Sequence, residues 1–166
     1  LADPHRGFSF MRASAELDLR FDPESGQSAA QWLAWNKEAE IANAIYRYGE
    51  ERYSRRIARE IVARRRREAS VKTVEDLVDV CKRCVPRSKN HDIHPATRTF
   101  QAFRIFINAE LEELQQALSA SLRLLRPGGR LVVISFHSLE DRIVKQFIAG
   151  HSREVVDRRA LFAPST

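Results

Sequence analysis

One stretch, residues 94–150, most constrains what this chain can fold into. Apolar residues recur every three or four positions over residues 100–125, which predicts one helix with a single apolar face. A Pro-Gly-Gly turn at 127–129 then ends that helix. The run at 131–134, Leu-Val-Val-Ile, is typical of a strand covered on both faces, as in a parallel sheet. The stretch therefore predicts part of an α/β architecture.

A polar segment follows the predicted strand. In open α/β sheets ligands bind beyond the carboxyl ends of the strands, and here that position holds Ser135, His137 and Ser138. Ser138 and Asp141 also have the spacing of a capping box, which predicts that a helix begins there. Exposed histidines usually carry no chemistry, so capping and loop stabilisation are the commoner explanation for these residues.

Size and composition fit one ordinary domain, or one domain and part of another. The chain has 166 residues, of which 43% are hydrophobic and 30% are charged. No apolar stretch approaches the length of a membrane span, so we expect no membrane partner and a cytoplasmic location. Because the chain starts at Leu1 rather than Met, we expect it to be part of a longer product.

The two cysteines form a lone C-x-x-C, at Cys81 and Cys84. A zinc site would need two further ligands, and none lies nearby at the spacing that metal sites use. We therefore expect no metal, and favour two cysteines on one face of a helix. Such sparing use of cysteine fits a reducing compartment.

Punctuation by proline, glycine and capping residues divides the chain into four segments. Residues 1–27 are irregular, 28–93 form a helical module, 94–150 form the α/β piece, and 151–166 form a tail. Within the module, Ser28 and Thr73 are candidate N-caps, the latter with Asp76 at capping-box spacing. A single predicted strand cannot make a sheet, so the α/β piece needs partner strands that are not in this chain.

The positive charge is concentrated in one helix, expected over about residues 50–67. Between residues 47 and 67 nine arginines face three glutamates, a balance of +6 that equals the net charge of the whole chain. Too few glutamates are present for a fully paired, solvated helix face, although that alternative stays open. We favour a surface that binds the phosphate backbone of a nucleic acid. Its candidate residues are Arg52, Arg55, Arg56, Arg59, Arg64, Arg65, Arg66 and Arg67.

Four runs carry a resemblance to a known family. They are Gly7-Phe8-Ser9-Phe10, Tyr48-Gly49-Glu50-Glu51-Arg52, Pro95-Ala96-Thr97-Arg98-Thr99-Phe100-Gln101-Ala102, and GGRLVVISFHSLEDRIVK from Gly128 to Lys145. With these runs the chain resembles the bacterial ribosomal RNA small-subunit methyltransferase H family, also called MraW. The resemblance implies an S-adenosylmethionine-dependent enzyme that methylates the N4 amine of a cytidine in the decoding region of 16S rRNA. It also implies a partial Rossmann-like methyltransferase core, with an inserted all-α domain for substrate recognition at 28–93.

The resemblance has limits that change what is expected of this chain. The family's glycine-rich cofactor loop and its ribose-binding acidic residue match positions before Leu1. The family's final strand would follow Thr166. We therefore expect an internal fragment without cofactor-binding residues of its own, inactive alone, with S-adenosylmethionine bound mainly by the part before Leu1.

The expected partners are 16S rRNA and the small ribosomal subunit. We expect six residues to line the substrate side of the cleft: Thr97, Arg98, Gln101, Ser135, His137 and Ser138. Plain helix capping is an equal alternative for Thr97, and no general base is assigned. Two other functions stay open: a non-catalytic basic helical RNA-binding module, and a different Rossmann-like methyltransferase with the same Pro-Gly-Gly-Arg turn.

Overall fold

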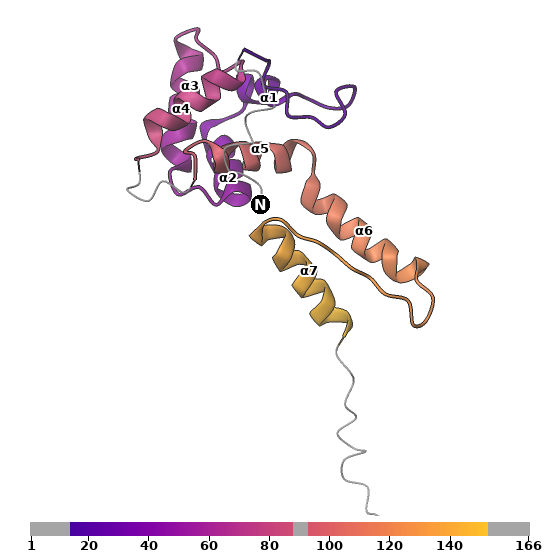
Figure 1. The fold of residues 1–166 in the computed structure, drawn as a ribbon. Helices are drawn as coiled ribbons and strands as arrows, with labels where there is room; N and C mark the ends of the chain where they lie inside the picture. The colour runs from indigo at the N-terminus through magenta and orange to yellow at the C-terminus, as the bar shows by residue number, and fades with distance from the viewer. Residues whose placement is uncertain (1–13, 88–92, 153–166) are drawn as a thin grey trace, which may run out of the picture. The chain divides into compact units, whose positions relative to one another are not determined.

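A computed structural model describes residues 14–87 and 93–152, which fall into two compact units that divide after Glu110. The leading residues 1–13, the middle of the expected linker at 88–92 and the tail from 153 lie outside the described residues. None of the helices in the described part has the length and hydropathy needed to cross a membrane. In chain order these helices are α1 (Ala29–Trp35), α2 (Glu38–Gly49), α3 (Ser54–Arg66), α4 (Val74–Cys84), α5 (Thr97–Ile107), α6 (Glu110–Leu124) and α7 (Ser138–His151) (Figure 1).

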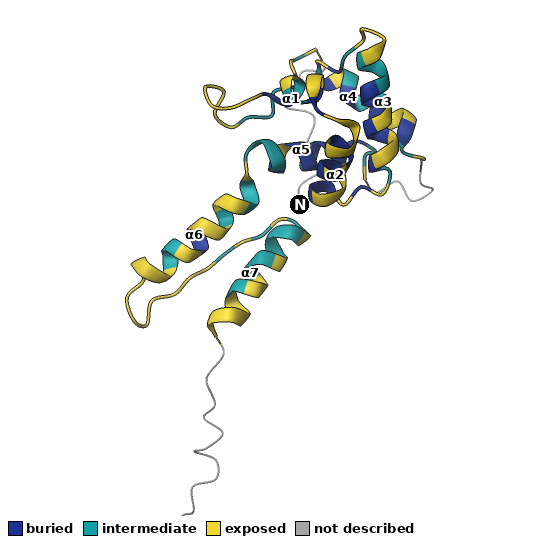
Figure 2. Ribbon diagram, turned by 180° about the vertical axis from the view of Figure 1, so that it is seen from behind, coloured by how far each residue is buried: buried dark blue, intermediate teal, exposed yellow. Residues whose placement is uncertain are grey.

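The core of the first unit forms between amphipathic helices. Helix α5 packs on α2, α2 on α3, and α3 on α4. Each helix turns a stripe of apolar side chains inward, so the dark-blue buried residues of Figure 2 gather between these helices. The fully buried side chains at the centre include Leu33, Ile45, Ile61, Leu77 and Phe103.

The segment before α1 ties two helix ends together. Leu17 is completely buried, and its backbone N–H donates to the Lys72 carbonyl at 2.8 Å. The Leu17 carbonyl accepts from the Ala30 N–H in the first turn of α1, also at 2.8 Å. An isolated antiparallel bridge joins Glu16 to Thr73 beside these bonds. This part of the predicted irregular segment therefore joins the starts of α1 and α4 through backbone hydrogen bonds.

Both predicted caps in the helical module are confirmed. The Ser28 hydroxyl accepts from the Gln31 N–H at 3.1 Å, and the Gln31 side chain accepts from the Ser28 N–H at 3.0 Å. Thr73 and Asp76 make the same reciprocal pair at the start of α4. These short-range patterns hold because each cap satisfies helix N–H groups locally, whatever packs around it.

The prediction of one long helix over 100–125 is wrong. The chain leaves the helix at Asn108 and Ala109, and Ala109 takes a positive φ of 48°. The Asn108 side chain donates to the Leu19 carbonyl at 2.8 Å and accepts from the Phe21 N–H at 2.8 Å. A contact 87 to 89 residues away in sequence thus ends α5, and helical periodicity carries no information about such a partner.

The second unit contains α6, α7 and the segment between them. The run 131–134 is not a strand in the structure, because no described segment pairs with it. Val132 and Ile134 are instead 82% and 76% exposed. Helix α7 begins at Ser138 as predicted, but its N-cap is His137 rather than Ser138. The named secondary-structure elements of the described residues are therefore all helices, and the α/β core stays a prediction, as do the domain boundaries.

Candidate nucleic-acid interface

Helix α3 has one apolar face and one cationic face. Ile57, Ala58 and Ile61 are buried against the rest of the first unit. The helix begins at Ser54 and ends at Arg66, with Arg67 as its C-cap, so it is slightly shorter than the predicted 50–67. At 100° per residue, the positions of Arg55, Arg59 and Arg66 lie on the side opposite this buried stripe. Helix geometry, together with the buried stripe seen in the structure, therefore sorts the arginines into an inner and an outer group.

Two arginines of the predicted set belong to the inner group. The Arg64 side chain is only 12% exposed; its Nη2 donates to Asp79 Oδ2 of α4 at 2.5 Å, and its Nε donates to Glu60 Oε1 at 3.1 Å. The Arg65 Nη1 donates to the carbonyls of Leu33 and Asn36, at 3.0 and 2.9 Å. These two guanidinium groups hold α3 against α4 and α1, so both already have protein partners.

The carboxylate partner of Arg64 responds to this contact. The hydrogen bond from the Arg64 guanidinium lowers the pKa of Asp79 from its usual value of 3.8, and a second ion pair to Arg83 acts in the same direction. Arg67 lies at the exposed end of the same network, with its Nη2 3.2 Å from Glu60 Oε1. The Glu60 carboxylate is thus shared between Arg64 and Arg67, and among the described residues it is not recorded as a partner of the arginines on the outer face.

Three arginines of the outer group have no partner among the described residues. Arg55, Arg59 and Arg66 are exposed, and the part of the chain that the structure describes records no ion pair or hydrogen bond for their side chains. They share one face and span a helical rise of about 16 Å. Guanidinium groups in a row at this spacing can contact successive phosphates of a nucleic-acid strand.

Arg52 and Arg56 stand beside this row, over one aromatic ring. Their guanidinium carbons lie 5.5 and 5.9 Å from the centroid of the Tyr53 ring. Tyr53 is therefore a half-buried aromatic ring with two exposed cations beside it.

The three cleft candidates of the first unit open helix α5. Thr97 is the first helical residue, and its buried hydroxyl has no hydrogen-bond partner among the described residues, so it does not cap the helix. Gln101 donates from Nε2 to the Tyr48 carbonyl at 3.4 Å. Arg98 is exposed. A Cβ atom added to Gly49 would lie only 2.3 Å from the Arg98 carbonyl oxygen. Gly49 therefore allows α2 and α5 to approach each other at this point.

The other three candidates lie in the second unit, at the start of α7. The His137 Nδ1 accepts from the Glu140 N–H at 3.4 Å, and its Nε2 lies 3.3 Å from Glu140 Oε1. Both ring nitrogens thus face the first turn of the helix, which is the capping role that the sequence left open. Ser135 is half-buried and Ser138 is the first helical residue. A shared cleft with the α5 residues stays a prediction.

The C-x-x-C cysteines are buried in the core of the first unit. Both are free thiols on α4, and burial raises the pKa of Cys81 to about 12. The Cys84 thiol lies 3.6 Å from the Arg56 carbonyl of α3. This agrees with the prediction of two cysteines on one helix face.

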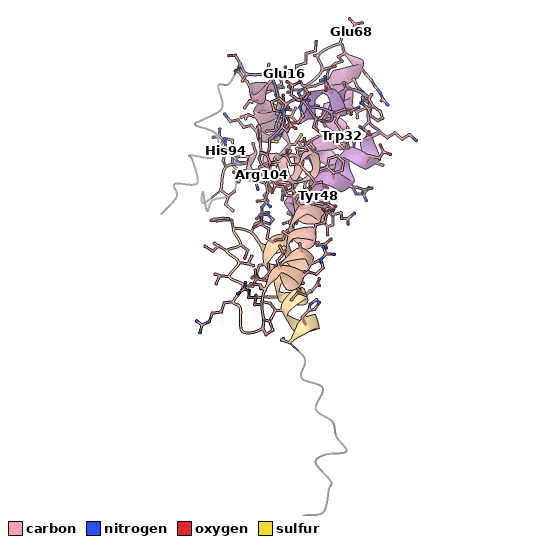
Figure 3. The ribbon with its side chains drawn as sticks, turned by 90° about the vertical axis from the view of Figure 1, so that its right-hand side faces the viewer. Glu16, Trp32, Tyr48, Glu68, His94 and Arg104 are labelled. Atoms are coloured by element: carbon pink, nitrogen blue, oxygen red, sulfur yellow. The ribbon has the colours of Figure 1, made fainter. Side chains whose placement is uncertain are left out.

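Sequence reasoning missed an aromatic cluster in the first unit. The Phe106 ring lies 4.8 Å from the Trp32 ring and 5.8 Å from the Tyr48 ring, centroid to centroid, and so joins α5 to α1 and α2. Figure 3 labels Trp32 and Tyr48. The three residues are 16 and 58 positions apart, so only the i, i+3 and i, i+4 spacing within each helix could have marked them as inward-facing.

Comparison with known proteins decides the family. Residues 1–163 match the MraW methylase family. The chain belongs to the MraW methylase family. Similar members are the proteins named "Ribosomal RNA small subunit methyltransferase H" from Acidovorax ebreus, 62% identical over 98% of this chain, and from Rhodopirellula baltica, 57% identical over 97%. The protein of that name from Methylibium petroleiphilum is 59% identical over 98% of this chain.

Membership in the MraW family confirms the predicted resemblance. The chain spans about half the length of the curated relatives it matches, 52% for the A. ebreus protein and 50% for the other two. Two of the motif runs that carried the resemblance lie next to each other in the first unit. The run at 48–52 forms the junction between α2 and α3, and the run at 95–102 opens α5.

Proposed function

We propose that this chain is part of an S-adenosylmethionine-dependent methyltransferase that modifies the N4 amine of a cytidine in the decoding region of 16S rRNA. The observation that carries the proposal is the family match over residues 1–163, together with relatives that are named as ribosomal RNA methyltransferases. Those names favour an enzyme over a purely RNA-binding module. The small ribosomal subunit or its 16S rRNA would be the macromolecular substrate.

Within that enzyme we propose that α3 binds the phosphate backbone of the rRNA. Support comes from the three outer arginines, which lack partners among the described residues, and from Arg52 and Arg56 beside them. Arg64 and Arg65 would contribute indirectly, because they fix the helix that carries the others. Contacts of this kind give affinity and register without reading sequence.

The proposed methyl transfer requires mainly positioning and proton acceptance from the protein, and little covalent catalysis. The lone pair of an exocyclic cytidine amine is delocalised into the ring, so the nitrogen must be held in line with the methyl donor and its proton must be accepted. A base-paired target would also have to leave its stack. The Thr97 hydroxyl and the exposed Arg98 at the start of α5 are our candidates for holding the substrate, together with Gln101. Ser135, His137 and Ser138 are the proposed second set.

The described residues do not themselves fit the cofactor. A nucleotide-type cofactor is usually held by a glycine-rich turn after a strand, at the start of a helix. In residues 14–87 and 93–152 the paired glycines, Gly128 and Gly129, follow helix α6 and precede an extended run. We therefore assign no residue of this chain to S-adenosylmethionine.

We further propose that residues 131–134 become a strand of the methyltransferase core. Their β-branched composition suits a covered strand, yet Val132, Ile134 and the nearby Phe136 are 82%, 76% and 89% exposed. Pairing with strands from the part of the family that this chain does not match would cover them.

The test uses a protein extended to the length of its relatives. It is incubated with isotopically labelled S-adenosylmethionine and small subunits, and the labelled nucleotide is mapped by mass spectrometry. We expect N4-methylcytidine in the decoding region. Label on another base, or on another RNA, would overturn the proposed substrate. Calorimetric titration of the cofactor into the 166-residue chain and the extended protein should give saturable heat only with the extended protein.

A further inference from the structure

We propose that Arg52, Tyr53 and Arg56 form a preassembled site for one unpaired nucleotide of the RNA. This three-residue set is called the Tyr53 site below. The inference rests on the proposed RNA-binding role of α3 and adds a ligand class to it: a single-stranded nucleotide whose base stacks on the site while its phosphate meets the arginines. A surface that only neutralises phosphates would not favour unpaired over paired RNA.

The platform of this site is fixed by its backbone. The Tyr53 N–H donates to the Glu51 side-chain Oε1 at 2.9 Å, and the Tyr53 carbonyl accepts from the Ile57 N–H at 3.1 Å. Glu51 is 3% exposed, so this carboxylate faces the protein and not the cationic face. Tyr53 is thereby held at the junction of the α2–α3 turn and the first turn of α3, where its ring stays half-buried.

The two arginines are organised by the ring. Both guanidinium carbons lie within 6 Å of its centroid, at 5.5 and 5.9 Å, which is the range of cation–π contact. Arg56 is further placed by α3 itself, whose backbone carbonyl at this residue faces the Cys84 thiol. Both side chains are exposed to a ligand, and their contacts with the ring reduce the cost of ordering them when it binds.

This combination matches an unpaired nucleotide better than a duplex. Guanidinium planes and aromatic rings are the surfaces on which proteins stack splayed-out bases, while the N–H groups of arginine bind the adjoining phosphate. In a duplex the base faces are buried in the stack and only phosphates are reachable. Arg55 and Arg59 lie next along the helix, about one turn apart, and would meet the flanking phosphates.

The experiment compares RNA binding by the 166-residue chain and its variants. The probe is a short single-stranded RNA with one 2-aminopurine, and the control ligand is the same RNA annealed to its complement. Tyr53→Leu should weaken single-strand binding about tenfold and abolish the fluorescence change of 2-aminopurine, with duplex binding nearly unchanged. Tyr53→Phe should bind as the parent does, because the ring is kept. Tyr46→Leu is the matched control, since Tyr46 is 65% exposed and no arginine is recorded over its ring in the described residues.

A second variant separates stacking from charge. Arg52→Lys with Arg56→Lys keeps both charges but removes the planar guanidinium groups, so the salt slope should persist while single-strand affinity falls several-fold. Equal losses for single strand and duplex would overturn the Tyr53 site and leave the proposed phosphate-binding role of α3 intact. A parent chain with no salt-dependent RNA binding would overturn that role itself.

Discussion

At the scale of single residues, the arginines of α3 divide by what their guanidinium groups touch. Arg64 and Arg65 donate to side-chain and backbone oxygens of α4 and α1, whereas Arg55, Arg59 and Arg66 meet no such group in the described residues. Arginines on one side of the helix therefore hold it against its neighbours, and arginines on the other side are available to a ligand. The sequence showed the charge excess, but eight arginines looked equivalent until the partners were known.

This division predicts opposite outcomes for two arginine substitutions. Arg64→Ala should lower the free energy of unfolding by about 1–3 kcal/mol, because Asp79 and Glu60 lose a shared, mostly buried partner. Arg66→Ala should change it by less than about 0.5 kcal/mol, since its side chain is exposed. Urea unfolding followed by circular dichroism measures both. Similar effects for the two variants would contradict the division.

The Arg64–Asp79 pair also predicts a dependence on pH. The pKa of Asp79 is lowered in the folded state from its ordinary value of 3.8. The ionised carboxylate therefore stabilises the protein fully when the pH is above that ordinary pKa. That contribution is lost as the pH falls through the lower, folded-state pKa. Asp79→Asn should therefore cost at most about 1 kcal/mol at pH 7, because the Asp79 carboxylate, whose side chain is 44% exposed, is screened by water.

The measurement is the difference in urea stability between the parent and Asp79→Asn, taken from pH 7 towards pH 3. We expect the difference to shrink in the acid part of that range. A difference that stays constant into acid would mean that the side chain acts by packing and not by charge.

At the scale of elements, local signals were reliable and long-range ones were not. The Ser28 and Thr73 caps could be predicted because each is completed within three residues. The break after α5 could not, because its cause is the Asn108 side chain bound to backbone groups near residue 20. The run at 131–134 has strand composition, but a strand exists only when paired, and no described segment pairs with it.

The close approach of α2 and α5 gives a test at this scale. A Cβ on Gly49 would lie 2.3 Å from the Arg98 carbonyl oxygen, and a backbone atom cannot simply rotate away. Gly49→Ala should therefore destabilise the first unit by about 1–3 kcal/mol, against the usual gain from replacing a helical glycine. Thermal unfolding provides the measurement.

Gly150 supplies the matched control for that substitution. It also lies in a helix, α7, but nothing stands within 4 Å of a Cβ at that position. Gly150→Ala should be neutral or stabilise by up to about 1 kcal/mol. Equal destabilisation by both alanines would show that α2 and α5 do not meet at Gly49.

At the scale of the whole molecule, the family and the charge distribution both support the proposed RNA partner. The match to the MraW methylase family brings relatives named for ribosomal RNA, and the local positive charge of the first unit suits a polyanion. The family could be predicted from four motif runs. The proposed cleft could not be tested by the fold, because its two sets of candidate residues lie in different units. Their roles stay predictions.

The most direct measurement is the salt dependence of decoding-region RNA binding by the 166-residue chain and two triple variants. One variant replaces Arg55, Arg59 and Arg66 with alanine. The other replaces the exposed Arg123, Arg126 and Arg130 of the second unit, and so removes the same charge elsewhere. We predict that only the first flattens the slope of log K against log salt, by up to about 0.9 for each lost duplex contact and about 0.7 on single strands. Equal slopes for the two variants would contradict the claim that the outer face of α3 binds the RNA.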